Sequence, residues 1–289
     1  MKVVNHIEDM QKISNQLRRA NLKIGLVPTM GFFHNAHLSL MKIAKQNSDV
    51  VIVSNFVNPL QFGPKEDLKT YPKDLSRDMK LAESVGVDYM FIPPDEEMYP
   101  SDYSTFVEVT QLDKYLCGKS RPSHFKGVVT VCTKLFNICK PDVVVFGQKD
   151  AQQAFIIRRL LRDLNYDCQM IIAPIVRESD GLAMSSRNIY LKSGNRKKAS
   201  ALYKSLQLAK RLIEVDGVRD SITVIDSITS FLNNELADLN PPVVIDYISI
   251  VDTNRLKPVD KLQSDVLIAL AVKIGNARLI DNIILKISD

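Results

Sequence analysis

The chain has 289 residues, of which 45% are hydrophobic and 25% charged, and it carries a net charge of +5. This balance is typical of a globular protein with one large domain or two smaller ones. It contains no apolar run long enough to span a bilayer and no signal-peptide pattern, so we expect a cytoplasmic protein that does not bind a membrane. The basic residues are spread along the chain, which argues against a nucleic-acid partner and suits small anionic substrates.

Apolar runs alternate with amphipathic patterns of about a dozen residues through the first part of the chain. The alternation predicts a parallel sheet with helices on both faces, and such sheets bind ligands beyond the carboxyl ends of their strands. In chain order, the pattern predicts a helix over 6–20, a strand over 24–27, a helix over 36–47, a strand over 49–57, a helix over 74–86, a strand over 89–92, a helix over 126–139, a strand over 143–146, a helix over 151–164 and a strand over 169–174.

The pattern changes after about residue 176. Two polar helices are predicted there, followed by three strands typical of an antiparallel meander. We therefore expect a first domain over 1–176 and a smaller α+β domain over 177–289. The helices are predicted over 193–214 and 219–238, and the strands over 243–251, 266–272 and 277–287. The four cysteines form no Cys-x-x-Cys pair, and Cys132 and Cys139 are expected to be buried, reduced thiols on one helix face.

The segment 28–37, Pro-Thr-Met-Gly-Phe-Phe-His-Asn-Ala-His, is the most informative about function. It joins a buried strand to a helix and places His34 and His37 at the helix N-terminus, with Asn35 as the expected N-cap. A helix N-terminus binds phosphate, and imidazoles beside it can stabilise charge on a transferring phosphoryl group. A zinc site on the two histidines is the alternative, but no third ligand stands close in sequence.

Two further loops follow predicted strands. Gln61, among apolar neighbours, is either part of a turn or an uncharged clamp that hydrogen-bonds a small hydroxylated substrate. In the second loop, Gly147 lets backbone approach a ligand, and Lys149 can pair with phosphate as a point charge. Asp150 can hold a ribose hydroxyl or a magnesium ion.

Two polar loops complete the candidate site. Ser185, Ser186 and Arg187 are consecutive phosphate-binding groups, although a polar interdomain linker would also explain them. Arg121 can pair with a carboxylate or a phosphate, and an interdomain salt bridge explains it equally well.

The segments Pro28–Gly31, Val57–Gly63, His124–Val128 and Asp180–Asn188, in this order, resemble the pantoate–β-alanine ligase (pantothenate synthetase) family. The resemblance covers nearly the whole chain and is densest from 24 to 191. It implies a Rossmann-like α/β sheet of the nucleotidyltransferase type, the group that includes class I aminoacyl-tRNA synthetases, with a smaller α+β C-terminal domain. The two-histidine motif corresponds to their His-Ile-Gly-His signature, and Met-Ser-Ser-Arg corresponds to their Lys-Met-Ser-Lys-Ser loop.

The resemblance implies a two-step ligase that uses ATP with Mg²⁺ and is a cytoplasmic homodimer. ATP and pantoate give pantoyl adenylate and pyrophosphate, and β-alanine then displaces AMP to form pantothenate. His37 is the implied proton donor, with His34 beside it on the phosphates and Lys149 as the third catalytic group. Gln61 and Gln153 are the implied pantoate ligands. The implied ATP-binding residues are Met30, Gly31, Phe32, Phe33, His34, Asn35, Ala36, His37, Gly147, Gln148, Lys149, Asp150, Val176, Met184, Ser185, Ser186 and Arg187.

Further expectations follow from this reaction. Gln61 also borders the β-alanine position, and Arg121 is a further anion contact. Because an acyl adenylate hydrolyses easily, the second domain is expected to act as a lid that excludes water. Two other functions remain open: a nucleotidyltransferase of coenzyme biosynthesis that leaves the nucleotide on its product, and a non-catalytic RNA-binding relative of the synthetases, against which the diffuse charge argues.

Overall fold

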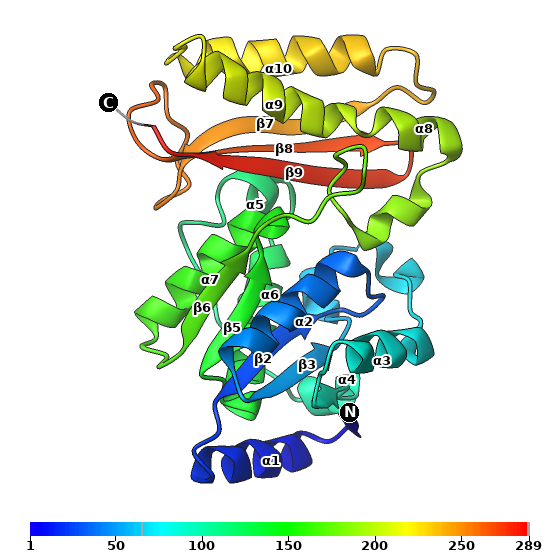
Figure 1. The fold of residues 1–289 in the computed structure, drawn as a ribbon, viewed down its shortest axis with the longest axis vertical. Coiled ribbons are helices and arrows are strands. Elements are labelled where there is room, and N and C mark those ends of the chain that lie inside the picture. Colours follow the sequence, from blue (N-terminus) through cyan, green and yellow to red (C-terminus); the bar gives the residue numbers. More distant parts are fainter. Residues whose placement is uncertain (65, 288–289) are drawn as a thin grey trace. The chain divides into compact units, whose positions relative to one another are not determined.

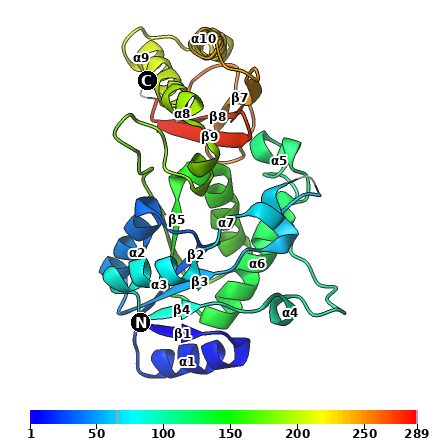
Figure 2. The ribbon, with the colours of Figure 1, turned by 90° about the vertical axis from the view of Figure 1, so that its right-hand side faces the viewer.

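The computed structural model describes residues 1–64 and 66–287. Contacts between Cα atoms divide the chain into two compact units (Figures 1 and 2). Unit 1 comprises Met1–Thr110, Arg121–Gln148 and Ile156–Pro174, and unit 2 comprises Gln111–Ser120, Lys149–Phe155 and the chain from Ile175 onward. This division differs from the single cut expected after residue 176, because two short segments from the first part of the chain belong to unit 2.

A parallel sheet forms the centre of unit 1, in the order β1-β4-β3-β2-β5-β6. The apolar runs of the sequence supply these strands, and the residues of β2, β3 and β5 are largely buried because helices cover the sheet. From β2 the chain proceeds to β3 and β4 in one direction, and then to β5 and β6 in the other, so the topological switch point lies between β2 and β5. The strands are β1 (Lys2–Val4), β2 (Ile24–Thr29), β3 (Val50–Asn55), β4 (Tyr89–Phe91), β5 (Val143–Gly147) and β6 (Gln169–Ala173).

Helices cover both faces of this sheet, as the alternating pattern predicts. In Figure 2, α2 and α3 lie on one side of the sheet and α6 on the other. Cys132 and Cys139 lie buried on α6 as free thiols, and burial raises the pKa of Cys132 to about 12. The helices are α1 (Ile7–Arg19), α2 (Asn35–Asn47), α3 (Leu75–Ser84), α4 (Asp95–Met98) and α6 (His124–Cys139), with α7 (Ala151–Asp163) beginning in unit 2 and continuing in unit 1.

Unit 2 is built on an antiparallel sheet in the order β7-β8-β9, which confirms the predicted meander. Helices α9 and α10 pack against each other, α10 also against β7 and α9 against β9 (Figure 1). The predicted helix over 193–214 is divided in two. The elements are α5 (Leu116–Ser120), α8 (Ser193–Lys198), α9 (Ala201–Glu214), α10 (Ser221–Glu235), β7 (Val244–Asp252), β8 (Val266–Ile274) and β9 (Ala277–Leu285).

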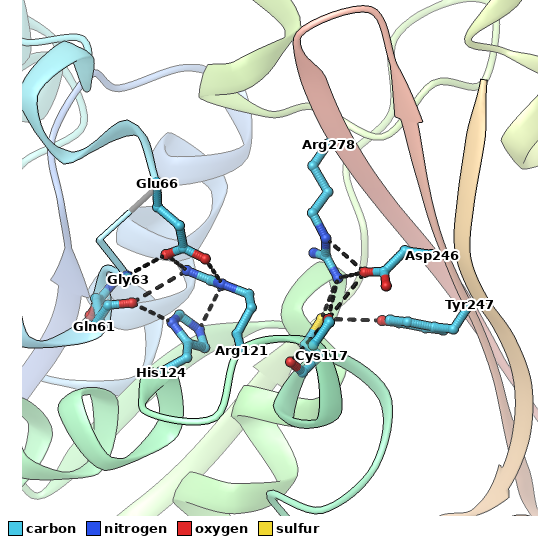
Figure 3. A network of polar contacts seen from close by, with 10 residues as sticks. Gln61, Gly63, Glu66, Cys117, Arg121, His124, Asp246, Tyr247 and Arg278 are labelled. Atoms are coloured by element: carbon cyan, nitrogen blue, oxygen red, sulfur yellow. Dashed lines mark hydrogen bonds and ion pairs between the residues drawn. The ribbon is translucent and has the colours of Figure 1, made fainter. Parts of the chain in front are cut away.

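Polar contacts explain why the segment 111–120 belongs to unit 2. The Arg278 guanidinium lies 2.6 Å from the Asp246 carboxylate, which also accepts a hydrogen bond from Ser120 Oγ at 3.1 Å. Cys117 Sγ lies 3.2 Å from the Tyr247 hydroxyl (Figure 3). These contacts fasten α5 to the strands of the small sheet.

The segment 149–155 joins the same unit through a buried amide. Gln152 Nε2 donates to the carbonyl oxygens of Leu112 and Tyr115, at 2.8 and 2.7 Å.

In the part of the chain that the structure describes, no helix has the length and apolar character needed to cross a membrane.

Candidate active site

The loop after β2 has a backbone that only particular residues allow. Gly31 and Phe32 have φ angles of 83° and 53°, in the left-handed region. A Cβ on Gly31 would lie 2.5 Å from Asn55 Oδ1, so both the conformation and the space require glycine. The loop therefore turns sharply just before the two histidines.

A buried carboxylate holds this turn. The Asp78 side chain accepts hydrogen bonds from the backbone N–H groups of Phe32 and Phe33, each at 2.7 Å. It also accepts one from Asn55 Nδ2 at 3.2 Å. Asp78 is 1% exposed, and this burial raises the pKa of its carboxyl despite the three donors. The Met30–Phe33 loop thus has a fixed shape.

His34 and His37 lie at the start of α2, as predicted, but the N-cap prediction was wrong. Asn35 is the first helical residue, and His34, with extended backbone, is the N-cap. His37 Nδ1 accepts a hydrogen bond from the His34 backbone N–H at 3.3 Å, and the two rings are 4.1 Å apart between centroids. In a neutral imidazole with Nδ1 as acceptor, the proton is on Nε2. His37 therefore offers Nε2–H as a donor at a helix N-terminus.

Gln61 lies at the end of η1 (Pro59–Gln61), a short turn of 3₁₀ helix after β3. Its Nε2 lies 2.8 Å from Met30 Sδ, and its Oε1 accepts a hydrogen bond from Asn58 Nδ2 at 3.1 Å. The structure therefore brings Met30 and Gln61 together, although they are far apart in the sequence.

Arg121 is held by an acidic partner in the same unit. Its Nε and Nη2 donate to Glu66 at 2.5 and 2.7 Å, and Nη2 also donates to the Gln61 carbonyl at 3.3 Å (Figure 3). His124 Nδ1 lies 2.8 Å from the same carbonyl. Burial acts to raise the pKa of Glu66, but the hydrogen bonds and charge of Arg121 outweigh it and lower that pKa. Arg121 thus supports the Gln61 backbone, and its contact with a substrate anion stays a prediction.

Gly147 ends β5, the strand beside β2 across the switch point. Among the described residues, a Cβ on Gly147 would meet only Leu40 Cδ2 within 4 Å, at 3.9 Å. The space beside this glycine is therefore left open by the packing of the chain, as a ligand-binding strand end requires.

The candidate residues of unit 2 are held by two adjacent residues of β9, Asp281 and Asn282. Asn282 Nδ2 donates to the Lys149 carbonyl oxygen at 3.0 Å. Asp281 forms a two-point ion pair with Arg177, at 2.6 and 2.9 Å. Burial raises the pKa of the Asp281 carboxyl, which is 2% exposed, while the charges of Arg177 and Lys149 act to lower it. The same strand thus anchors Lys149 and the start of the loop that carries the serines.

This loop is a tight turn. Met184 N–H donates to the Val176 carbonyl at 3.0 Å, and Arg177 Nη1 donates to the Gly181 carbonyl at 3.0 Å. Gly181 has a φ of 92°, and a Cβ there would lie 2.2 Å from the Tyr203 ring. Glycine is therefore required at this position as well.

The Met-Ser-Ser-Arg segment begins a 3₁₀ turn, η4 (Ser186–Tyr190). Ser185 is its N-cap, and Ser185 Oγ accepts a hydrogen bond from the Arg187 N–H at 3.2 Å. The segment is a structured turn in which the side-chain hydroxyl of Ser185 orders the backbone around Arg187. The binding of phosphate by Ser185, Ser186 and Arg187 stays a prediction.

The predicted residues are thus distributed over the two units. Those in unit 1 are Met30, Gly31, Phe32, Phe33, His34, Asn35, Ala36, His37, Gln61, Arg121, Gly147 and Gln148. Those in unit 2 are Lys149, Asp150, Gln153, Val176, Met184, Ser185, Ser186 and Arg187. Within residues 1–64 and 66–287, no group of three or more His, Cys, Asp and Glu side chains is placed to hold a metal ion.

Sequence reasoning missed the residues that hold these groups. Asp78 carries no sequence signal, because nothing separates it from the other charged residues of its helix. Asp281 and Asn282 carry one, since two consecutive polar residues interrupt an apolar strand. Such an interruption places one polar side chain on each face of the sheet, where each needs a partner.

The switch-point sheet and its loops define an α/β protein of the nucleotidyltransferase-like class. The family model described as "Pantoate-beta-alanine ligase" matches residues 2–284, and the chain belongs to this family. Similar proteins include the pantothenate synthetases of Fervidobacterium nodosum and Thermotoga neapolitana, each 53% identical, with 99% of this chain and 100% of the relative covered.

Solved structures agree with this assignment. Pantothenate synthetase from Thermus thermophilus has a TM-score of 0.88 and 39% identity, covering 98% of this chain and 99% of its own. Pantoate-beta-alanine ligase from Francisella tularensis, complexed with "Beta-gamma ATP" and β-alanine, has a TM-score of 0.80 and 36% identity, covering 98% and 97%.

Proposed function

We propose that the chain catalyses the ATP-dependent condensation of pantoate with β-alanine, giving pantothenate, AMP and pyrophosphate through a pantoyl adenylate. The observation that carries this proposal is the family match over residues 2–284, which includes the candidate residues of both units. The related Francisella tularensis enzyme, whose structure was solved with an ATP ligand and β-alanine, supports the same substrates.

In the first step, a pantoate carboxylate oxygen attacks the α-phosphorus of ATP, and the bond to pyrophosphate breaks with its electron pair. Negative charge builds on the leaving pyrophosphate, so the rate depends on fixed donors and cations around it. His37 Nε2–H supplies a neutral donor, with His34 beside it, and Lys149 and Arg187 supply positive charge. Gln61 and Gln153 hold pantoate.

The ATP-binding residues of this proposal are Met30–His37, Gly147–Asp150, Val176 and Met184–Arg187. Mg²⁺ bound with ATP would be held mainly by phosphate oxygens, with one or two carboxylates beside them. Asp150 would supply such a carboxylate, since its side chain is 51% exposed. The ion would supply charge neutralisation on the phosphates.

In the second step, the β-alanine amine, at a position bordered by Gln61, attacks the acyl carbon. The carbon–oxygen bond to AMP breaks, and the nitrogen loses a proton. Because water competes with the amine, exclusion of water raises the yield. Unit 2 is therefore proposed to act as the lid that excludes water. The enzyme is also proposed to be a cytoplasmic homodimer, as the family resemblance implies.

Mass analysis of the products from ATP, pantoate and β-alanine tests the function, with His37→Ala as the control. We expect pantothenate and AMP in equal amounts from the unchanged enzyme and about a hundredfold less from the variant, because a fixed donor to the developing charge is lost. A product that retains the nucleotide would instead identify a nucleotidyltransferase of coenzyme biosynthesis. The absence of pantothenate at saturating substrates would overturn the proposal.

A further inference from the structure

We propose that Tyr99 is a positioning residue: its hydroxyl, together with the Gly127 carbonyl, holds Asn58 in the orientation that decides which atom of the Gln61 side-chain amide faces the substrate. The inference rests on the proposed function, in which Gln61 holds pantoate. All three residues belong to unit 1. Amide orientation matters because one side of the group donates hydrogen bonds and the other accepts them.

The three side chains form a continuous chain of hydrogen bonds. The Tyr99 hydroxyl donates to Asn58 Oδ1 at 2.8 Å. Asn58 Nδ2 then donates to Gln61 Oε1 at 3.1 Å. Asn58 is 1% exposed, so water is not available to replace a lost partner. Each link therefore constrains the next.

The backbone of α6 gives this chain its direction. Asn58 Nδ2 also donates to the Gly127 carbonyl at 3.0 Å, and a carbonyl can only accept. A Cβ on Gly127 would lie 2.4 Å from the carbonyl of Leu60, so η1 lies directly against the helix backbone with no room for a side chain between them. The amide nitrogen of Asn58 must face Gly127, which leaves Asn58 Oδ1 to accept from the Tyr99 hydroxyl at 2.8 Å and from the Leu60 backbone N–H at the longer distance of 3.4 Å.

The orientation of Gln61 follows from this arrangement. Asn58 Nδ2 has two hydrogens, one directed at Gly127 and the other at Gln61 Oε1. Gln61 Oε1 is therefore turned toward Asn58, and Nε2 is left on the side of Met30 Sδ, 2.8 Å away. The substrate meets an N–H donor, which selects a carboxylate or hydroxyl oxygen and disfavours an ammonium group.

The Tyr99 hydroxyl is suited to act as a permanent hydrogen-bond donor. Its ring packs between Phe56 and Tyr103, with centroids 6.1 and 5.1 Å away. Burial raises the pKa of this phenol well above its usual range, so the hydroxyl keeps its proton at neutral pH. Tyr99→Phe removes the hydroxyl and keeps the ring packing.

The matched control is Tyr103→Phe, which removes a hydroxyl from the neighbouring ring. For Tyr99→Phe we expect the KM for pantoate to rise about tenfold with the KM for ATP unchanged, since one hydrogen bond to a buried amide is lost. Tyr103→Phe is expected to leave both constants at the wild-type values. A merely structural role would change both KM values together or neither, and either result for Tyr99→Phe would overturn the inference.

A second pair of variants tests the direction of the amide. If Nε2 is the donor to substrate, Gln61→Glu places oxygen against an anionic substrate and weakens pantoate binding more than the uncharged Gln61→Met does. Gln61→Glu that binds pantoate better than Gln61→Met would show that Oε1 faces the substrate, against the inference. If the unchanged enzyme makes pantothenate, these outcomes test only the inference about Tyr99. If the unchanged enzyme makes none, the proposed function is refuted.

Discussion

The candidate residues of unit 1 and those of unit 2 are held in place by different kinds of contact. In unit 1, neutral groups such as Gln61 and His37 are oriented by hydrogen bonds from buried amide and backbone groups. In unit 2, Lys149 and the loop from Arg177 onward are anchored on β9, where an ion pair joins the partly exposed Arg177 to the buried Asp281 carboxylate. Neutral, oriented groups recognise the shape and polarity of a substrate, whereas cations respond to charge that appears during the reaction.

This contrast predicts different consequences of substitution. Loss of an orienting group in unit 1 changes substrate selection. The Gln61 amide can still form hydrogen bonds, but it no longer presents a fixed atom to the substrate. Loss of a cation in unit 2 changes the rate of pyrophosphate departure. The following predictions test this separation, starting with the largest expected effect.

Lys149→Met removes a cation proposed to face the phosphates. We expect the rate of adenylate formation to fall about a thousandfold, the scale for losing a fixed electrostatic contact to a developing charge. Single-turnover measurement of AMP formation checks this, with the KM for pantoate changing little. A fall of less than tenfold would remove Lys149 from the catalytic groups.

Arg177→Met leaves the Asp281 carboxylate buried without its partner. The free energy of unfolding is expected to fall by about 3 kcal/mol, as for other broken buried pairs. Urea unfolding followed by circular dichroism measures it. The matched control is Arg162→Met, in the exposed pair with Asp163, where the expected loss is below about 1 kcal/mol. Equal losses in both variants would show that the pair on β9 has no special role in unit 2.

Asn282→Ala removes the hydrogen bond to the Lys149 carbonyl, so Lys149 is expected to lose its fixed position. We expect kcat to fall about tenfold, the equivalent of one buried hydrogen bond, with the KM for pantoate unchanged. Asn233→Ala, on an exposed part of α10, is the control and should retain full activity. If the two variants have equal kcat, β9 does not position Lys149.

The pH dependence of stability gives the smallest effect. The folded-state pKa of Glu66 is lowered, so its pair with Arg121 stabilises the fold above the pKa of the unfolded chain, and this stabilisation is lost as pH falls through the folded-state pKa. Between pH 6 and pH 3, we expect the free energy of unfolding to fall less for Glu66→Gln than for the unchanged protein. The difference should be about 1 kcal/mol, measured by urea unfolding at each pH. Parallel stability curves would contradict the pairing.

The sequence predicted most elements of the sheet, because buried strands and amphipathic helices have distinct periods. Three-residue β1 was missed because it is too short to show a period. The N-cap at His34 was missed because histidine is not among the usual capping residues.

The candidate site was predicted in part. The loops after β2, β3 and β5 could be located from the alternation of strands and helices, since parallel strands end at the same edge. The supporting residues could not. Tyr99 contacts Asn58 across 41 positions of sequence, and Asn282 contacts Lys149 across 133, so only the folded chain reveals either pair.

The central claim is that this chain activates pantoate with ATP before any amine takes part. Exchange of labelled pyrophosphate into ATP, measured without β-alanine, tests it directly. We predict rapid exchange that requires pantoate and is lost in Lys149→Met. Exchange that proceeds equally without pantoate, or none at all from folded enzyme with both substrates saturating, would contradict the account.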